Sequence, residues 1–237
     1  MTYVLSDIHG CYELYKKMLE KIDFRDEDIL YVIGDVVDRG PEPIEVLWDM
    51  SMRHNVIPIL GNHDFIAHQI LGQLLMELTE ENLKKHFGGK IDNFLLDVAS
   101  WEDMGGDTTI RGFGKLPFDK RADVIEYLSE FSLYEKISVC GQKYILTHIG
   151  IPDGATPDNL DGFDAYDFIG PEIDTNYRKV YFEDTILVTG HLPTATISKE
   201  YRGRIYRKNN HIAIDVGAVF GFGMGCVCLD TGEEFYE

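Results

Sequence analysis

The sequence predicts an α/β fold in which buried strands alternate with amphipathic helices. The run Ile29–Ile33 holds five apolar residues, rich in β-branched and aromatic types, which suits a strand covered on both faces. A shorter apolar run, Tyr3–Leu5, comes before it, and between the two the apolar positions of Tyr12–Ile22 recur at helical spacing. This is the pattern of a βαβ unit, and Asp and Gly residues follow both apolar runs.

The next segments continue the alternation of helix and strand. Pro41–Pro43 can open a second helix, because Pro suits a helical first turn, and Asn55–Leu60 has the composition of a third strand. Residues 65–101 carry two helical stripes, one of them ending at Leu78, and predict a helical insertion. The segment Gly105–Gly112 predicts a glycine-rich loop, and it lacks the G-K-[ST] ending of a phosphate-binding P-loop.

The second half of the chain predicts one more helix, a hairpin, a long loop and a closing group of strands. The helix covers Ala122–Phe131, and the hairpin covers Lys136–Thr147 with its turn at Gly141. Pro152–Asn176 is rich in Asp, Gly and Pro, which predicts an irregular loop. A strand at Thr185–Thr189 follows, and antiparallel strands are expected at residues 205–206, 212–214 and 224–229.

Length and composition indicate the number of domains and argue against some classes of partner. With 237 residues and no linker-like stretch, we expect a single domain over residues 1–237. The formal net charge of −19 repels nucleic-acid backbones and anionic membranes, so neither is an expected partner. The chain has no leader-like start and no apolar run long enough for a bilayer, so we expect a cytoplasmic protein. The four cysteines lack C-x-x-C spacing, which argues against a structural zinc site.

Polar side chains with metal-ligand chemistry follow the predicted strands. A single His after a strand is more often structural, and charged loop tips are common. In this chain, four of the eight His follow predicted strands, and this repetition favours a metal or catalytic site over separate structural roles. Carboxylate, imidazole and amide groups suit divalent Mn, Fe or Zn, and two metals would fit this many ligands. These residues are Asp7, His9, Asp35, Asn62, His63, His148 and His191.

The order of these motifs resembles the signature of the phosphoprotein phosphatase family within the calcineurin-like metallophosphoesterases. The resemblance covers Tyr3 to about Thr194, and the Gly105–Thr109 loop is similar to one in compact bacterial and phage members. It implies two packed mixed β-sheets flanked by helices, with the site at the strand ends. The matching motifs are Ser6–Gly10, Gly34–Gly40, Gly61–Asp64, Thr147–Gly150 and Gly190–His191.

The resemblance also implies a two-metal site. Asp7 and His9 would bind one divalent ion, and Asp35 would bridge both ions. Manganese is the first expectation for both metals, with iron or zinc as alternatives. A metal-bridging hydroxide would be the nucleophile. The ligands of the second ion would be Asn62, His148 and His191.

Further roles follow from the same resemblance. His63 would protonate the leaving oxygen, and Asp38 would hold its imidazole in the right tautomer. Arg39 and Asn62 would contact the phosphate, and a planar guanidinium does so in a geometry that lysine does not match. Arg178 is the only Arg between the last two His ligands, so spacing alone makes it the candidate for a second phosphate-binding arginine.

The expected function is that of a dinuclear-metal phosphomonoesterase, in the first place a serine/threonine or dual-specificity protein phosphatase. An alternative is a hydrolase of dinucleoside polyphosphates such as diadenosine tetraphosphate. A third, of another class, is a pseudophosphatase that binds phosphoproteins without turnover. The expected partner is therefore a phosphorylated protein or a small phosphate ester. The motifs describe the phosphoryl centre and leave the rest of the substrate open.

Overall fold

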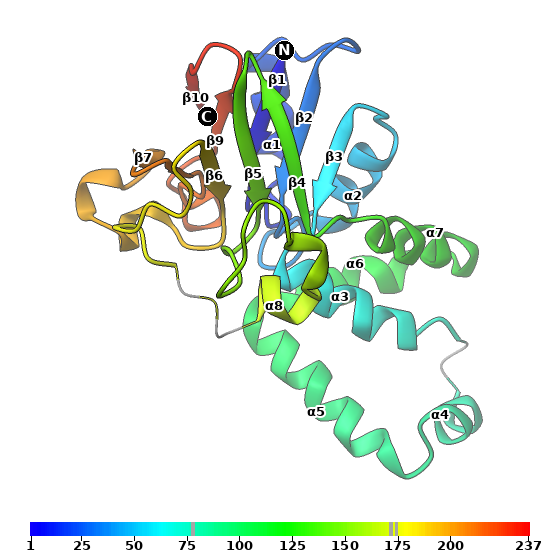
Figure 1. The fold of residues 1–237 in the computed structure, drawn as a ribbon. Helices are drawn as coiled ribbons and strands as arrows, with labels where there is room; N and C mark the ends of the chain where they lie inside the picture. The colour runs from blue at the N-terminus through cyan, green and yellow to red at the C-terminus, as the bar shows by residue number, and fades with distance from the viewer. Residues whose placement is uncertain (77–78, 171–172, 174) are drawn as a thin grey trace.

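A computed structural model of the chain describes residues 1–76, 79–170, 173 and 175–237 (Figure 1). Over these residues the strands form two five-stranded sheets, in the orders β10-β9-β1-β2-β3 and β4-β5-β6-β8-β7. Both sheets contain parallel and antiparallel pairs. The predicted architecture of two packed mixed sheets flanked by helices is confirmed.

The first sheet contains the predicted βαβ unit. Three parallel strands form its centre and one edge: β1 (Thr2–Leu5), β2 (Ile29–Ile33) and β3 (Val56–Ile59). On the other side of β1 lie two antiparallel strands, β9 (Gly225–Cys228) and β10 (Glu234–Tyr236). The crossover helices α1 and α2 span Tyr12–Lys21 and Pro43–Ser51.

Strand β2 is covered on both faces, as its uninterrupted apolar run predicts. Leu30 and Val32 belong to the apolar cluster that includes the helices around the first sheet. Tyr31 and Ile33 belong to a second cluster, which fills the space between the two sheets together with Leu146 and other residues of the second sheet. Side chains alternate between the faces of a strand, so each face of β2 reaches a different core.

The second sheet brings three further strand ends to the same region. Its strands are β4 (Tyr134–Val139), β5 (Gln142–Thr147), β6 (Thr185–Thr189), β8 (His211–Ala213) and β7 (Tyr206–Lys208). β5, β6 and β8 are parallel, so their carboxyl ends meet at one edge. The predicted hairpin of β4 and β5 is confirmed, and its two turn residues both have positive φ, as type I′ turns require.

The predicted closing group of antiparallel strands is partly wrong. β7 and β8 pair antiparallel, but β8 lies parallel to β6, and β9 joins the other sheet beside β1. β10 was not predicted at all. These strands have three or four residues, so local sequence carries little information about which distant strand each one pairs with.

The segment predicted as helical, residues 65–101, is largely helical, and its first helix begins three residues earlier, at Asn62. α3 spans Asn62–Gln73, α4 spans Glu80–Phe87 and α5 spans Ile91–Trp101, and α4 and α5 project away from the sheets (Figure 1). Leu78, counted in one predicted stripe, lies outside the described residues. That this segment is an insertion in a single domain stays a prediction.

The glycine-rich loop prediction for Gly105–Gly112 is wrong. A π-helical turn over Glu102–Gly106 leads directly into α6 (Asp107–Lys115), and α7 (Phe118–Ser129) follows. The helical path bends at Gly105, whose φ of 105° is a conformation that glycine adopts without steric cost. Contacts with distant residues stabilise this helix despite its glycine content, and intrinsic propensity alone does not reveal them.

The described residues of the long segment predicted as a loop are irregular except for one short α-helix and one 3-10 helix. α8 spans Ala165–Ile169 and begins with a capping box, in which the Asp164 carboxylate accepts from the backbone N–H groups of Tyr166 and Asp167.

Within the described residues, no helix has both the length and the apolar character needed to cross a membrane. Short 3-10 helices span Gly88–Lys90, Leu160–Gly162, Thr194–Thr196, Lys199–Tyr201 and Ala218–Phe220.

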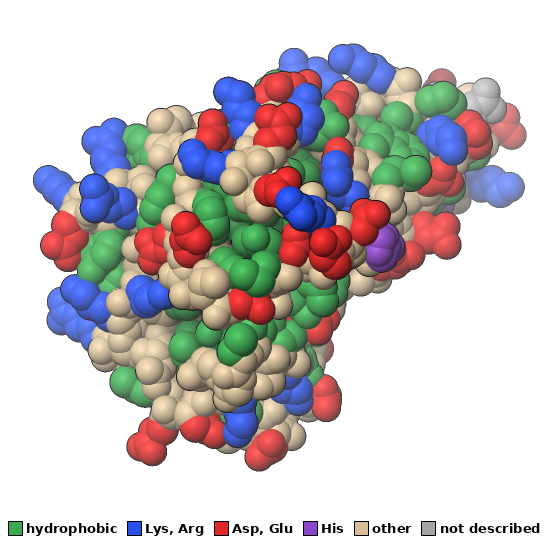
Figure 2. Space-filling model, turned by 90° about the horizontal axis from the view of Figure 1, so that it is seen from above, with side chains coloured by type: hydrophobic (Ala, Val, Ile, Leu, Met, Phe, Trp, Pro, Cys, Tyr) green, Lys and Arg blue, Asp and Glu red, His purple; other side chains and the backbone are tan. Residues whose placement is uncertain are grey.

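The surface carries charges of both signs. Figure 2 shows the molecule from above relative to Figure 1, and on this face Lys and Arg side chains lie among Asp and Glu side chains. The net charge of −19 therefore does not appear there as a single acidic patch.

Candidate metal centre

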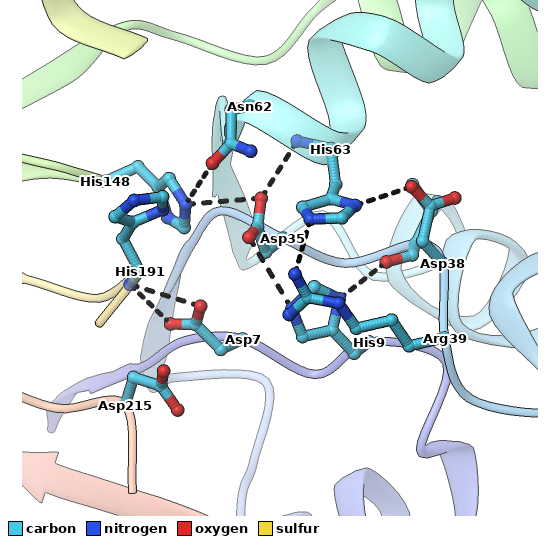
Figure 3. A network of polar contacts seen from close by, with 12 residues as sticks. Asp7, His9, Asp35, Asp38, Arg39, Asn62, His63, His148, His191 and Asp215 are labelled. Carbon is cyan, nitrogen blue, oxygen red and sulfur yellow. Dashed lines mark hydrogen bonds and ion pairs between the residues drawn. The ribbon is translucent and has the colours of Figure 1, made fainter. Parts of the chain in front are cut away.

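The carboxyl ends of strands from both sheets meet in one cluster of polar side chains (Figure 3). Asp7 and His9 follow β1, Asp35 follows β2, and Asn62 begins α3 directly after β3. All predicted metal-ligand and catalytic residues lie in this cluster. Its members are Asp7, His9, Asp35, Asp38, Arg39, Asn62, His63, His148 and His191, joined by Asp215.

The backbone at these strand ends is unusual. Ten described non-glycine residues have positive φ, and six of them belong to the cluster. Such left-handed conformations are costly for residues with a Cβ, and their concentration here marks a functional site, where surrounding structure maintains them. The six are Asp7 (52°), His9 (45°), Asp35 (53°), Asp38 (72°), Arg39 (65°) and His191 (69°).

Glycines beside the ligands allow the strand ends to approach one another closely. A Cβ on Gly34 would lie 2.4 Å from Nδ1 of His148, and one on Gly61 would lie 2.2 Å from the backbone N of Asp35. Gly34 also has a φ of 71°. A Cβ at either position would therefore clash with a predicted metal ligand, His148 or Asp35.

Asp35 lies at the centre of two groups of ligand atoms. One group is His9, Asp35 and His63, and the other is Asp35, His148 and His191; within each, the ligand atoms lie within 4.8 Å of one another. Asp35 Oδ2 is 3.6 Å from His9 Nε2, and Oδ1 is 3.2 Å from His148 Nε2. The carboxylate is shared between both groups, as a bridging ligand would be.

Backbone carbonyl groups orient two of the imidazoles. His9 Nδ1 donates to the carbonyl oxygen of Val37, and His148 Nδ1 donates to that of Ile33, each at 2.9 Å. Both rings therefore direct Nε2 toward Asp35. Hydrogen bonds of this kind fix the ring orientation of metal-binding histidines in proteins.

Burial and neighbouring charges set the protonation of the ligands. Burial lowers the pKa of His9 and of His191 to about 4, so both imidazoles are neutral at neutral pH, the form that binds metals. Burial opposes the charge on Asp35, but the adjacent His148 holds the pKa of Asp35 well below its usual range. Although burial opposes the charge of His148, Asp35 raises the pKa of His148 to about 10.

The residues fit divalent metal ions. Asp7 and Asp35 are 2% exposed, and neither has an ion pair with Lys or Arg among the described residues. Burial, together with the nearby Asp215, raises the pKa of Asp7. Buried carboxylates of this kind are normally paired or coordinate a metal. His191 Nδ1 is buried without a hydrogen-bond partner, which leaves a nitrogen available for coordination.

His63 and Arg39 lie beside the metal-ligand groups. His63 Nδ1 is 2.6 Å from Oδ2 of Asp38, so Asp38 accepts the Nδ1 proton and His63 Nε2 faces the cluster. The guanidinium of Arg39 donates to His63 Nε2 at 2.9 Å and to His9 Nε2 at 2.7 Å. Figure 3 shows the guanidinium between these two rings. Arg39 is therefore within reach of any group bound at the cluster.

A model of the family described as calcineurin-like phosphoesterase matches residues 2–221 of the chain. The chain belongs to this family. The His and Asp groups around Asp35 are candidate ligands for the divalent metals that this family uses.

Relatives within the family include tetraphosphatases. A curated relative from Pseudomonas fluorescens, named symmetrical bis(5′-nucleosyl)-tetraphosphatase, is 32% identical over 155 residues, 64% of this chain and 43% of the relative. The chain thus spans less than half the length of this relative, and it spans 24% of one from Buchnera aphidicola with the same name.

Two solved structures resemble the chain in fold. A protein proposed to be a diadenosine tetraphosphatase has a TM-score of 0.59 at 18% identity, covering 100% of this chain and 92% of that one. A cold-active protein-tyrosine phosphatase from a psychrophilic Shewanella has a TM-score of 0.55 at 18% identity, covering 99% and 79%. At such identities the likeness shows the fold alone.

The structure does not bring Arg178 to the metal centre of this calcineurin-like phosphoesterase. Arg178 is exposed, and its backbone N–H donates to Asn176 Oδ1 in a surface turn. The surface pocket that it lines includes Tyr201 and Lys208 and none of the proposed metal ligands. Arg178 was a candidate only because it lies between two predicted His ligands in the sequence. Along an irregular segment, such spacing does not determine where a side chain lies in space.

Four further residues of the site were missed by sequence reasoning. Asp215 follows β8 and is 5% exposed; burial raises its pKa to about 6. The signal was present, because an apolar strand followed by Asp is the pattern used for Asp7 and Asp35. Asp64 was included only as the last residue of a matching motif, yet its carboxylate accepts from the backbone N–H groups of Val36, Val37 and Gly61. The other two are Trp101 and Thr109.

Proposed function

We propose that this chain is a two-metal hydrolase of dinucleoside polyphosphates, with diadenosine tetraphosphate as the representative substrate. The sequence analysis expected a protein phosphatase first and gave this activity as an alternative; the order of the two is now reversed. The observation that supports metal-dependent hydrolysis is the position of Asp35 between two ligand groups, with His63 and Arg39 adjacent. The names of the tetraphosphatase relatives support the substrate class.

The proposed ligand assignment keeps Asp35 in both groups and adds Asp7 and Asn62, which the family resemblance implies, while His63 is given a role on the substrate instead. Asp7, His9 and Asp35 would hold one divalent ion. Two bound dications lower the pKa of water and neutralise phosphoryl oxygens, which allows direct attack on phosphorus without a covalent enzyme intermediate. The second ion would be held by Asp35, Asn62, His148 and His191.

The remaining residues would act on the substrate itself. Arg39, with its planar fork, would contact phosphoryl oxygens beside the metals. His63, whose Nδ1–H is held by Asp38, would present Nε2 to the leaving oxygen and deliver a proton as the bond to phosphorus breaks. In a dinucleoside tetraphosphate cleaved symmetrically, that leaving oxygen belongs to a nucleoside diphosphate.

Side-by-side kinetics would test the proposed substrate. With Mn²⁺ supplied, we expect a higher kcat/KM for diadenosine tetraphosphate than for phosphoserine and phosphotyrosine peptides, with ADP as the nucleotide product. ATP plus AMP as products would contradict symmetrical cleavage. A higher kcat/KM for a phosphopeptide would favour the protein phosphatase instead. Binding of phosphopeptide without turnover of any ester would indicate a pseudophosphatase.

A further inference from the structure

The carboxylate of Asp38 accepts hydrogen bonds from two residues that the proposed function leaves without a role. Oδ2 accepts from Trp101 Nε1 at 2.7 Å, in addition to His63 Nδ1 at 2.6 Å. Oδ1 accepts from Thr109 Oγ1 at 2.6 Å. All four side chains are at most 1% exposed. Hydrogen bonds to an ionised acceptor are the strong ones, and three of them fix the carboxylate in one orientation.

The same helical segment also holds the backbone next to Asp38. The Asp38 N–H donates to Thr109 Oγ1 at 3.0 Å, and the Arg39 N–H donates to the carbonyl oxygen of Gly105 at 2.8 Å. Asp38 and Arg39 have φ values of 72° and 65°, a conformation that persists only where neighbouring groups maintain it. The π-helical turn over Glu102–Gly106 and the start of α6 provide these groups.

The two glycines between α5 and α6 make this approach sterically feasible. A Cβ on Gly105 would lie 2.7 Å from Cγ of Arg39, and one on Gly106 would lie 2.5 Å from Nε1 of Trp101. The glycine-rich stretch that resembles a loop in the sequence is therefore where helices pack closely against the Asp38 loop.

We propose that Trp101 and Thr109 are positioning residues for His63. By fixing the Asp38 carboxylate, they keep Oδ2 on the Nδ1–H of His63 and so keep Nε2 directed at the leaving oxygen. Neither side chain touches substrate or metal in this assignment. The inference rests on the proposed role of His63 as the general acid, and it predicts a loss of rate that depends on the leaving group.

Two variants each remove one donor and keep the approximate shape. For Trp101→Phe and Thr109→Val, we expect kcat for an alkyl phosphate to fall by about 10- to 100-fold, by analogy with residues that orient metal-binding side chains. The loss for an aryl phosphate should be much smaller, because that leaving group needs little protonation. Metal content per chain should be unchanged.

Matched variants elsewhere in the chain control for general destabilisation. Trp48→Phe changes the only other tryptophan, and Thr185→Val changes a buried threonine that starts β6 and donates to Asp184. Neither should alter the ratio of the alkyl to the aryl rate. In addition, Thr109→Val should cost little further activity in an Asp38→Asn background, since both changes interrupt the same chain of contacts.

A spectroscopic measurement tests the contact without turnover. The chain has two tryptophans, so a ¹H–¹⁵N spectrum has two indole N–H signals. Asp38→Asn should shift the Trp101 signal, which Trp101→Phe identifies by its absence, and leave the Trp48 signal in place. An unshifted Trp101 signal would overturn the proposed contact.

The kinetic outcomes separate this inference from the proposed function. If His63→Asn shows the leaving-group dependence but Trp101→Phe and Thr109→Val slow both esters equally or not at all, the positioning role is overturned alone. If His63→Asn itself slows both esters equally, the acid role fails and the positioning role fails with it.

Discussion

The two halves of the site are built in different ways. In the metal half, Asp7, Asp35, His148 and His191 lie within two residues of a strand end, and strand ends and glycines hold them. In the other half, Asp38 is held by side chains that are 63 and 71 residues away in sequence, on α5 and α6. The metal half thus depends on backbone geometry, and the Asp38 half depends on a chain of side-chain hydrogen bonds.

This difference predicts two kinds of functional damage. A change in the metal half should slow every substrate alike, because the charge that stabilises the transferred phosphoryl group is needed for all of them. A change in the half around Asp38 and His63 should depend on the leaving group. The following predictions test whether the two halves separate in this way.

Asp35→Asn should cause the largest loss of activity. Each metal contributes several kcal/mol to the transition state, and about 6 kcal/mol corresponds to roughly 10⁴-fold in rate. We expect losses of that order on alkyl and aryl phosphates alike, with fewer metal ions retained. Asp23→Asn is the matched control, since Asp23 has a similar φ of 49° and is exposed. A metal-replete Asp35→Asn protein with normal turnover would contradict the account.

Gly34→Ala should show how strongly the backbone holds the metal half. The new Cβ would meet the His148 ring at 2.4 Å in a left-handed conformation, so we expect the free energy of unfolding to fall by about 3 kcal/mol. Gly141→Ala has a comparable φ of 83° but no atom within 4 Å, and it should cost only about 1 kcal/mol. Denaturant unfolding compares the two, and equal losses would refute the close-approach argument.

His63→Asn should lower kcat for alkyl phosphates by about 10²-fold or more, the usual range for general acid catalysis. Aryl phosphates should be affected much less. Steady-state kinetics on both esters, with metal content measured on the same samples, would show the two effects. Comparable losses on the two esters would remove the distinction between the halves.

Among the three substitutions expected to slow turnover, Arg39→Lys should have the smallest effect, about tenfold in kcat/KM, because the charge stays and the planar fork is lost. Metal content should not change, since Arg39 contacts His9 and His63 only through its guanidinium. Unchanged kcat/KM would argue against a phosphate contact, and lost metal would indicate a structural role in the metal half.

The metal half was largely predictable because its pattern is local. An apolar run comes shortly before each proposed ligand, all of which are Asp, His or Asn. The same pattern comes before Asp215, which was not predicted. Trp101 and Thr109 could not be found this way, because their contact with Asp38 depends on the path of α5 and α6. The pairing of β8 with β6, and of β9 with β1, was missed for the same reason: it is decided by distant partners.

The most direct test of the account is the number and position of metal ions around Asp35. Crystals grown with Mn²⁺ should give two anomalous peaks about 3.5–4 Å apart, the spacing of two-metal hydrolytic sites. Both should contact Asp35, one on the side of Asp7 and His9 and the other on the side of His148 and His191. A single peak, or two peaks of which only one contacts Asp35, would contradict the bridging role.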